Sequence, residues 1–492
     1  MPRPALALPL AALLAACAVG PDFAPPKPPA ITGYTAENLA PETAAAATQG
    51  GDAQHFVEDM DVPGQWWTLF HSEPLNALIE QSLKANPEIK GAQATLRGAI
   101  ENLRAEQGAL FPQIQASFTP QRFKDAGQTS PTLNVPQSYF NLYTAQLSVS
   151  YPLDIWGGTR RAVESARAQG ESQRYQLEAT YLTLTSNVVA AALQEASLKD
   201  QIAATEKIIQ IETEALTLFK KQLALGQVAG GDVAAQEAAL AQAQTALPPL
   251  RKQLAQQRDL LAALAGRFPS DQPEQSFDLA TLALTTELPV TLPATLIRNR
   301  PDIRIAEEDL HAASAQIGVA IANMLPNLTL SATNGTTATQ LGQLFMPGNG
   351  FWTLGSSLTQ TVFDGGTLLA RKRAADAALD QAMAQYESTV LTAFQNVADT
   401  LRALQADADA MKASLAAEQA AGRSLDIARR QLALGSISSL GLLNAEQTYQ
   451  QAVITLIQAR AGRYADTAAL FQALGGGWWN RQDDAPDLRK AT

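Results

Sequence analysis

The residue with the most distinctive chemistry is the single cysteine, Cys17. It ends the letters LAAC, which follow a basic residue, Arg3, and an apolar stretch over residues 5–14. This order resembles a bacterial lipobox, in which the cysteine thiol is acylated and becomes the mature N-terminus. We expect residues 1–16 to be a signal peptide and Cys17 to carry a diacylglycerol and an N-acyl chain. The alternative is an ordinary small-residue cleavage site beside an unmodified cysteine.

The residue after the cysteine bears on the destination of the chain. Position 18 is alanine, whereas an aspartate at this place keeps bacterial lipoproteins in the inner membrane. We therefore expect a lipid-anchored protein of the bacterial outer membrane.

Other reactive residues form no recognisable site. One cysteine cannot make an intrachain disulfide, and the three histidines, His55, His71 and His311, lack the spacing of a zinc site. No nucleophile motif or glycine-rich phosphate loop stands out, and the carboxylates fall on helix faces where they are solvated. A net charge of -11 argues against nucleic acid as a partner. We expect no catalytic residues, no metal and no cofactor besides the lipid.

Four segments alternate between apolar and small polar residues with the period of two that strands show. They lie at residues 114–119, 143–151, 328–333 and 352–362. A soluble sheet with one face on a core would have the same alternation. Strands of about ten residues with aromatic side chains near their ends, in an exported chain, favour a membrane β-barrel. Four strands are too few to close one, so several subunits must share it, and the residues leave eight or twelve strands open.

Two other segments predict exceptionally long helices. Residues 160–225 and 367–434 contain no proline, and their apolar residues recur at a helical period. Each helix would extend about 100 Å at 1.5 Å per residue. From Leu379 to Leu404 the apolar spacing approaches that of a coiled coil, so we expect these helices to lie along partners.

The pentapeptide QLALG ends both long helices, at residues 222–226 and 431–435. A glycine can take the left-handed conformation after a helix, and the basic pair before each copy suits the negative end of the helix dipole. New helices are expected from about Asp232 and Leu440, so each copy marks the tip of a helical hairpin.

The chain divides into two halves with the same order of elements. After an N-terminal linker at residues 17–60, we expect a short helix, a second helix, two strands and a helical hairpin in residues 61–270. The same order is expected in residues 271–478, followed by a tail at residues 479–492. Pro87 and Pro301 start the second helix of each half.

Together with the motifs FPQIQASF, RPDIRIAEEDLHAASAQIGVA, FDGG and ALGGGW, this order resembles the TolC family of outer membrane efflux factors, most closely its OprM/CusC/NodT lipoprotein branch. The resemblance implies an α+β membrane protein and a homotrimer with one transmembrane β-barrel of twelve strands and a periplasmic α-barrel of helical hairpins. It also implies a passive efflux duct that receives small molecules from an inner-membrane resistance-nodulation-division pump through a periplasmic adaptor.

In this family the hairpin tips meet the adaptor and form the periplasmic gate. The resemblance makes these residues candidates for adaptor docking: Leu225, Gly226, Leu434, Gly435 and Ser436. The family motif LxLLDA corresponds to residues 440–445, so Leu440, Leu443 and Asn444 are the gate candidates. Asn444 replaces the expected acidic residue, which predicts weak block by multivalent cations. Asp232 is a possible acidic tip residue or a helix cap.

The chief alternative is an exported lipoprotein that uses long coiled coils as a structural spacer in the periplasm. It would purify without detergent after lipid removal and would show no conductance. The substrate is not readable from the sequence.

Overall fold

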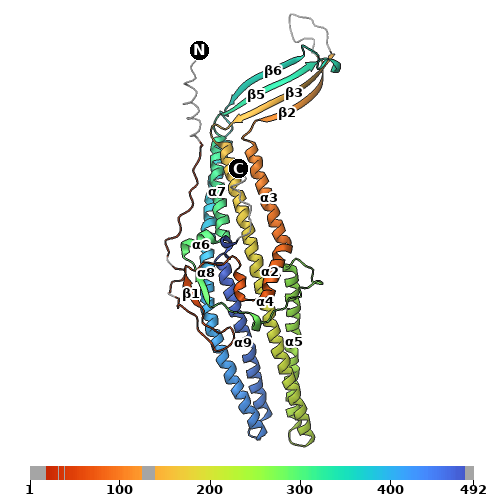
Figure 1. Ribbon diagram of the computed structural model, residues 1–492, viewed down its shortest axis with the longest axis vertical. Helices are drawn as coiled ribbons and strands as arrows, with labels where there is room; N and C mark the ends of the chain where they lie inside the picture. The colour runs from red at the N-terminus through yellow and green to blue at the C-terminus, as the bar shows by residue number, and fades with distance from the viewer. Residues whose placement is uncertain (1–17, 32, 38, 125–138, 482–492) are drawn as a thin grey trace.

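The computed structural model describes residues 18–31, 33–37, 39–124 and 139–481 (Figure 1). Within them the molecule is elongated, with a sheet at one end and two pairs of helices that end in separate turns at the other. The thicker region between, where further helices, short strands and loops surround the long helices, is called the waist below. The predicted signal peptide and lipid site, residues 1–17, lie outside the described residues.

Each half contains helices and strands in the predicted order. In the first half these are α2 (Glu73–Ala85), α3 (Pro87–Gly108), β2 (Gln113–Lys124), β3 (Tyr139–Leu153), α4 (Gly158–Ala224) and α5 (Gly230–Leu264). In the second half they are α6 (Pro293–Asn299), α7 (Pro301–Ala322), β5 (Asn327–Ala338), β6 (Gly350–Thr359), α8 (Thr367–Ala433) and α9 (Ser439–Ala473). The matching long helices have equal lengths, 67 residues for α4 and α8 and 35 for α5 and α9.

The four long strands form one antiparallel sheet in the order β2-β3-β5-β6. In its register, most apolar residues of one strand pair with apolar residues of the next, and most polar residues pair with polar residues. One row of paired residues is apolar: Ile114, Val149, Ala332 and Leu354. The adjacent row is polar: Gln115, Ser148, Thr333 and Thr353. Because side chains alternate between the two faces of a sheet, one face is apolar and the other polar.

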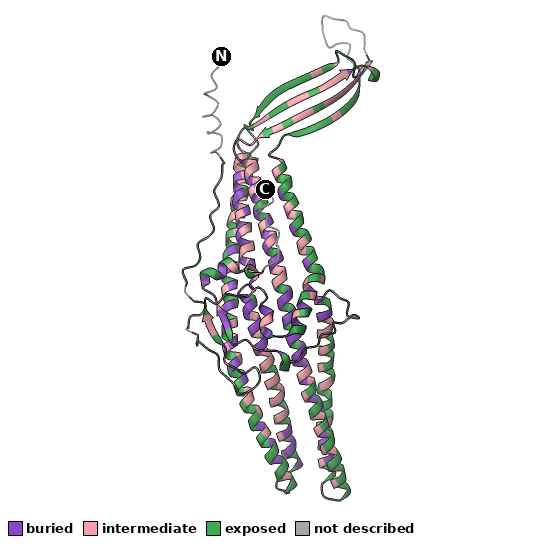
Figure 2. Cartoon of the chain, viewed as in Figure 1, coloured by how far each residue is buried: buried purple, intermediate pink, exposed green. Residues whose placement is uncertain are grey.

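The apolar face of the sheet is uncovered within a single chain. Ile114, Trp352 and Leu354 are each more than 70% exposed, and Figure 2 shows no buried layer against either side of the sheet. None of the described helices is both long and apolar enough to cross a membrane.

The core lies at the waist, where the helices of both halves meet. It is built around Trp66, which stacks on Phe471 with ring centroids 5.5 Å apart, and around Phe70 and Tyr464. Buried positions follow the inner sides of α4, α8 and α9 through this region (Figure 2). This packing sets the directions in which the two helical hairpins extend from the waist toward the tips.

The N-terminal segment contributes to this waist, although the sequence predicted a linker without a core element. Strand β1 (His55–Glu58) pairs in parallel with β4 (Glu287–Val290). Arg463 of α9 is fully buried and donates hydrogen bonds to the Thr43 hydroxyl and the Gln54 side chain. The prediction is therefore wrong for residues 43–58, because a four-residue strand and isolated polar contacts leave no periodic pattern.

Candidate functional site

Both copies of QLALG end a long helix in the same way. The amide of Gln227 donates to the carbonyl of Gln222 at 2.8 Å, and that of Ser436 donates to the carbonyl of Gln431 at 2.8 Å. A second, shorter-range bond accompanies each, from Gly226 to Leu223 and from Gly435 to Leu432. This pair of bonds is the Schellman motif, which satisfies carbonyls left free at a helix end. The repeated pentapeptide therefore makes two equivalent turns at the tips (Figure 1).

The candidate docking residues lie on the outside of these turns. Leu225 and Leu434 are 73% and 81% exposed. Gly226, Gly435 and Ser436 are exposed beside them. Each tip therefore exposes one leucine to the surroundings.

The gate candidates are divided by their burial. Leu440 is 62% exposed and Asn444 is exposed one turn later on α9. Leu443 is buried within the chain. Of the three, only Leu440 and Asn444 are therefore exposed on the surface of the chain.

Asp232 has a capping role at the start of α5. Its carboxylate accepts a hydrogen bond from the amide of Ala229, the N-cap residue, at 3.1 Å. Asp232 thus occupies the third position of the helix and not the N-cap itself, and its negative charge suits the positive end of the helix dipole.

The structure reveals a polar cluster above the tips that the sequence did not predict. We call it the inter-hairpin cluster; its members are Glu212 on α4, Gln236 on α5, Arg429 on α8, and Glu446 and Gln450 on α9. Glu212 accepts hydrogen bonds from the amide nitrogens of Gln236, at 2.5 Å, and Gln450, at 2.9 Å. Nη2 of Arg429 lies 3.7 Å from Oε1 of Glu446. All four helices of the two hairpins therefore contribute to one cluster.

Burial dominates the electrostatics of this cluster. Glu212 and Glu446 are 2% and 4% exposed. Burial, followed by the negative charge of Glu212, raises the pKa of Glu446 to about 7, while Arg429 opposes the shift. Burial also raises the pKa of Glu212, against the hydrogen bonds from the two glutamines. The one sequence signal is that Glu446 follows Leu442 and Leu443 at helical spacing, on the buried side of α9.

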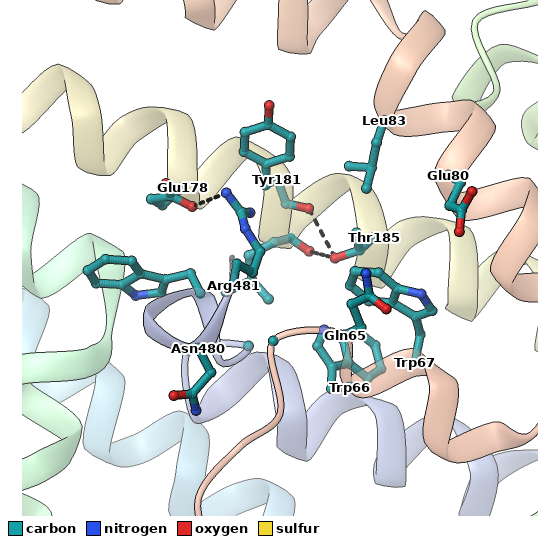
Figure 3. Close-up of a pocket in the computed structure, with 15 residues that line it drawn as sticks. Gln65, Trp66, Trp67, Glu80, Leu83, Glu178, Tyr181, Thr185, Asn480 and Arg481 are labelled. Carbon is teal, nitrogen blue, oxygen red and sulfur yellow. Dashed lines mark hydrogen bonds and ion pairs between the residues drawn. The ribbon is translucent and has the colours of Figure 1, made fainter. Parts of the chain in front are cut away.

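A cavity of about 440 Å³ lies at the waist between η2 (Trp66–Phe70), α2, α4 and the end of α9 (Figure 3). Arg481 lines this cavity, and its guanidinium lies 2.9 Å from Glu178 and above the ring of Tyr181. This ion pair joins the C-terminal end of the described chain to α4. Among the described residues, no group of three His, Cys, Asp or Glu side chains could hold a metal ion.

The described chain begins against the junction of the sheet and the long helices. A side-chain carbon added at Gly157 would meet Cα of Ala18 at 2.8 Å, so the first residues pass directly over this glycine. Arg161 of α4 donates to the carbonyl of Val19 and pairs with Asp22 at 2.7 Å. Residue 18 is therefore held close to the sheet.

Phe23 and His311 of α7 hold the same segment further along. Their rings stack with centroids 4.3 Å apart. Hydrogen bonds to Glu308 and Glu164 raise the pKa of His311 above its usual range, against the effect of burial.

Comparison with known proteins identifies the family. The family model described as outer membrane efflux protein matches residues 78–267 and 292–476. The pyoverdine export outer membrane protein OpmQ of Pseudomonas aeruginosa is 29% identical over 425 residues, which cover 84% of this chain and 87% of that protein. The toluene efflux pump outer membrane protein TtgC of Pseudomonas putida is 28% identical over 479 residues, with 96% and 95% covered.

Solved structures agree with these relatives. The outer-membrane channel OprN is similar with a TM-score of 0.83 and 28% identity, over 94% of this chain and 100% of that one. The predicted resemblance to the TolC family is confirmed, and so are the outer membrane location and the efflux channel function. The chain belongs to the outer membrane efflux protein family, the family of TolC-type channels.

Proposed function

We propose that the protein acts as a homotrimeric exit duct. Three chains together contribute twelve strands to one transmembrane β-barrel in the outer membrane. Their helical hairpins form an α-barrel that crosses the periplasm. Small molecules pass through this duct passively, and the energy for transport comes from an inner-membrane pump.

The observation that carries this proposal is the four-stranded sheet with two open edges. Strands β2 and β6 each pair on one side only among the described residues. Unpaired strand edges are unstable in a membrane, where backbone groups must find partners in the protein. Pairing β2 of one chain with β6 of the next closes the sheet and turns its apolar face toward lipid and its polar face toward the lumen.

The helices support a tube of the same symmetry. At 67 residues, α4 and α8 are each about 100 Å long, and each packs against a 35-residue antiparallel helix. We propose that residues 61–270 and 271–478 are two structural repeats. Three chains then place six similar hairpins around one axis.

We propose that the tips bind a periplasmic adaptor, which connects the duct to a resistance-nodulation-division pump. The exposed Leu225 and Leu434 next to Gly226, Gly435 and Ser436 form the contact surface. Leu440 and Asn444 narrow the mouth, and Leu443 supports them from inside the hairpin.

A lipid on Cys17 would anchor the chain at the same level as the barrel. The support for this is the position of Ala18, the next residue, against Gly157 at the junction of sheet and helices. A diacylglycerol and an N-acyl chain together give stable membrane attachment, whereas a single acyl chain gives only marginal attachment.

The duct performs no catalysis in this proposal, and selection of the cargo lies with the pump. OpmQ and TtgC carry the names of different cargoes, pyoverdine and toluene, and are almost equally similar to this chain. Their likeness therefore favours neither cargo.

Electron microscopy and conductance measurements test the proposal on the mature protein purified in detergent. A trimer with a tube of about 100 Å extending from the micelle, and stepwise conductance in a planar bilayer, are expected. A monomeric, detergent-independent particle without conductance would instead support the rival function, an exported coiled-coil lipoprotein that acts as a periplasmic spacer.

A further inference from the structure

Two buried oxygens of the inter-hairpin cluster have no hydrogen-bond donor. Oε2 of Glu446 is buried without a hydrogen-bond partner, and so is Oε1 of Gln236. The Gln236 side chain is 1% exposed, so water outside the chain does not reach it freely. A buried charged oxygen without a donor is costly, and such groups in proteins are usually paired or protonated. A proton on Glu446 would remove the charge from its unpaired oxygen.

The cluster also joins the two hairpins. Gln450 of α9 donates to Glu212 of α4 in the cluster, and higher up Gln458 of α9 donates to Gln201 of α4 at 3.2 Å. Glu446 lies one turn before Gln450 on α9, on the same side of the helix. Any movement of α9 away from α4 near the tips must therefore break the hydrogen bond from Gln450 to Glu212.

We propose that Glu212 and Glu446 form a proton-controlled latch between the two helical hairpins. When Glu446 carries a proton, the two carboxyl groups lie together inside the cluster and the hairpins stay in contact. When both are ionised, two buried negative charges repel and the contact loosens.

The charged groups that face Glu446 among the described residues come from two helices. Glu212 of α4 raises its pKa and Arg429 of α8 lowers it. The side chain of Arg429 is 43% exposed and its guanidinium lies 3.7 Å away, so solvent screens its attraction. Helix α5 contributes to the cluster the neutral amide of Gln236, which already donates to Glu212. Nothing in the cluster fully compensates two ionised carboxylates.

The pH range of the latch follows from burial. Because burial raises the pKa of Glu446 to about 7, the latch is protonated under acidic conditions and loses its proton near neutrality. An exposed glutamate has a pKa of about 4.3 and would be ionised throughout this range. The latch thus responds to pH changes between about 6 and 8.

The consequence for transport rests on the proposed function. Leu440 and Asn444 precede Glu446 on the same helix, so a displacement of α9 at the latch carries the mouth residues with it. The latch favours the closed mouth at acidic pH and makes opening easier above neutrality. It is a conformational device within one chain and does not itself require a trimer.

Spin-label distances test the latch in the full chain. Labels are placed on Leu218→Cys of α4 and Ile427→Cys of α8, at positions where the native side chains are both more than half exposed. The native cysteine is replaced as Cys17→Ala, so that only the two introduced cysteines can be labelled. Mixing labelled with unlabelled subunits isolates the distance within one chain. From pH 5.5 to 8.5 we expect the mean distance to lengthen by at least about 1–2 Å and its distribution to broaden, as for helix shifts at interfaces.

Matched variants identify the groups responsible. Glu446→Gln keeps the shape of a protonated glutamate, so it should hold the short distance at both pH values. Glu212→Gln removes the opposing charge and should reduce the pH response. Glu214 is an exposed carboxylate two residues after Glu212 on α4, so Glu214→Gln should respond to pH like the unsubstituted chain.

Two results would overturn the latch. One is a distance in the unsubstituted chain that does not change with pH, and the other is the same change in Glu446→Gln. Because the labels lie in one chain, the measurement stays interpretable if the protein is not a trimeric duct. Absence of conductance would contradict the proposed function and leave the latch standing.

Discussion

Gly226 and Gly435 end the two long helices with the same left-handed backbone, at φ values of +71° and +70°. A side-chain carbon at either position would meet nothing within 4 Å. Space is therefore available, and the backbone conformation alone requires glycine. The two hairpins turn by the same local device, which is why the sequence repeats five letters there.

Replacing either glycine by alanine should fray the tip without disturbing the waist. The left-handed conformation costs about 1–2 kcal/mol for a residue with a side chain. Hydrogen exchange of the peptides ending at residues 226 and 435 should become roughly tenfold faster, and other helices should be unchanged. Gly231→Ala is the control, because that glycine has no positive φ and open space around it. Equal protection in all three variants would contradict this account of the tips.

Much of the fold could be predicted from the positions of proline and glycine and from the spacing of apolar residues. Proline at positions 87 and 301 and glycine at 226 and 435 set helix boundaries to within a few residues, because these residues act on the local backbone. Pro248 and Pro249 did not end α5, which continues to Leu264. Both prolines are exposed there, and the helix is held by its packing on α4. Tertiary contact overrides local preference at that point.

The inter-hairpin cluster was beyond sequence reasoning. Glu212 and Glu446 belong to different halves of the chain, and their approach depends on how α4 crosses α9. Glu212 and Glu446 are each a single polar residue on the buried side of a helix. The pattern of apolar residues along one helix does not show which residues of another helix that side contacts. The N-terminal contacts of Arg463 were missed for the same reason.

The two faces of β6 should respond differently to a positive charge. Leu354 lies in the apolar row of the sheet and Thr353 in the polar row. In a membrane barrel, an arginine on the lipid face near midplane costs about 2–4 kcal/mol, whereas lumen positions tolerate charge. Leu354→Arg should lower the yield of folded protein in the outer membrane, measured by heat-dependent gel mobility, and Thr353→Arg should not. Equal loss in both variants would argue against a lipid-facing apolar row.

Acylation of Cys17 is measurable by intact mass spectrometry. We expect the mature chain to begin at residue 17 and to exceed its peptide mass by a diacylglyceryl group and one acyl chain. Cys17→Ala should lose this added mass. The sheet should still form, because Arg161 and His311 hold the following residues independently of the lipid. A mature chain with a free thiol would disprove lipidation.

Asn444 should determine how multivalent cations block the channel. An amide carries no charge, so unsubstituted channels should be blocked weakly by hexaamminecobalt in single-channel recordings. Asn444→Asp adds one carboxylate per subunit at the exposed start of α9 and should increase the affinity for the cation at least tenfold, about 1.4 kcal/mol. Asn444→Ala is the uncharged control and should remain weakly blocked. Micromolar block of the unsubstituted channel, lost only when Asn444 is changed, would refute this assignment.

The protonation of Glu446 should make stability fall as pH rises. Its pKa of about 7 in the folded protein lies above the ordinary value of a glutamate, so the folded state binds more protons between the two values. Stability is highest below the ordinary value, declines through this interval and levels off above pH 7. At about 1.4 kcal/mol per unit the decline over the whole interval is roughly 4 kcal/mol. Glu446→Gln should flatten this profile and be more stable than the unsubstituted chain at pH 8. Denaturant unfolding at pH 5 and pH 8 measures both, with Glu214→Gln as the control. A profile for Glu446→Gln that declines as steeply as that of the unsubstituted chain would show that other groups cause the fall.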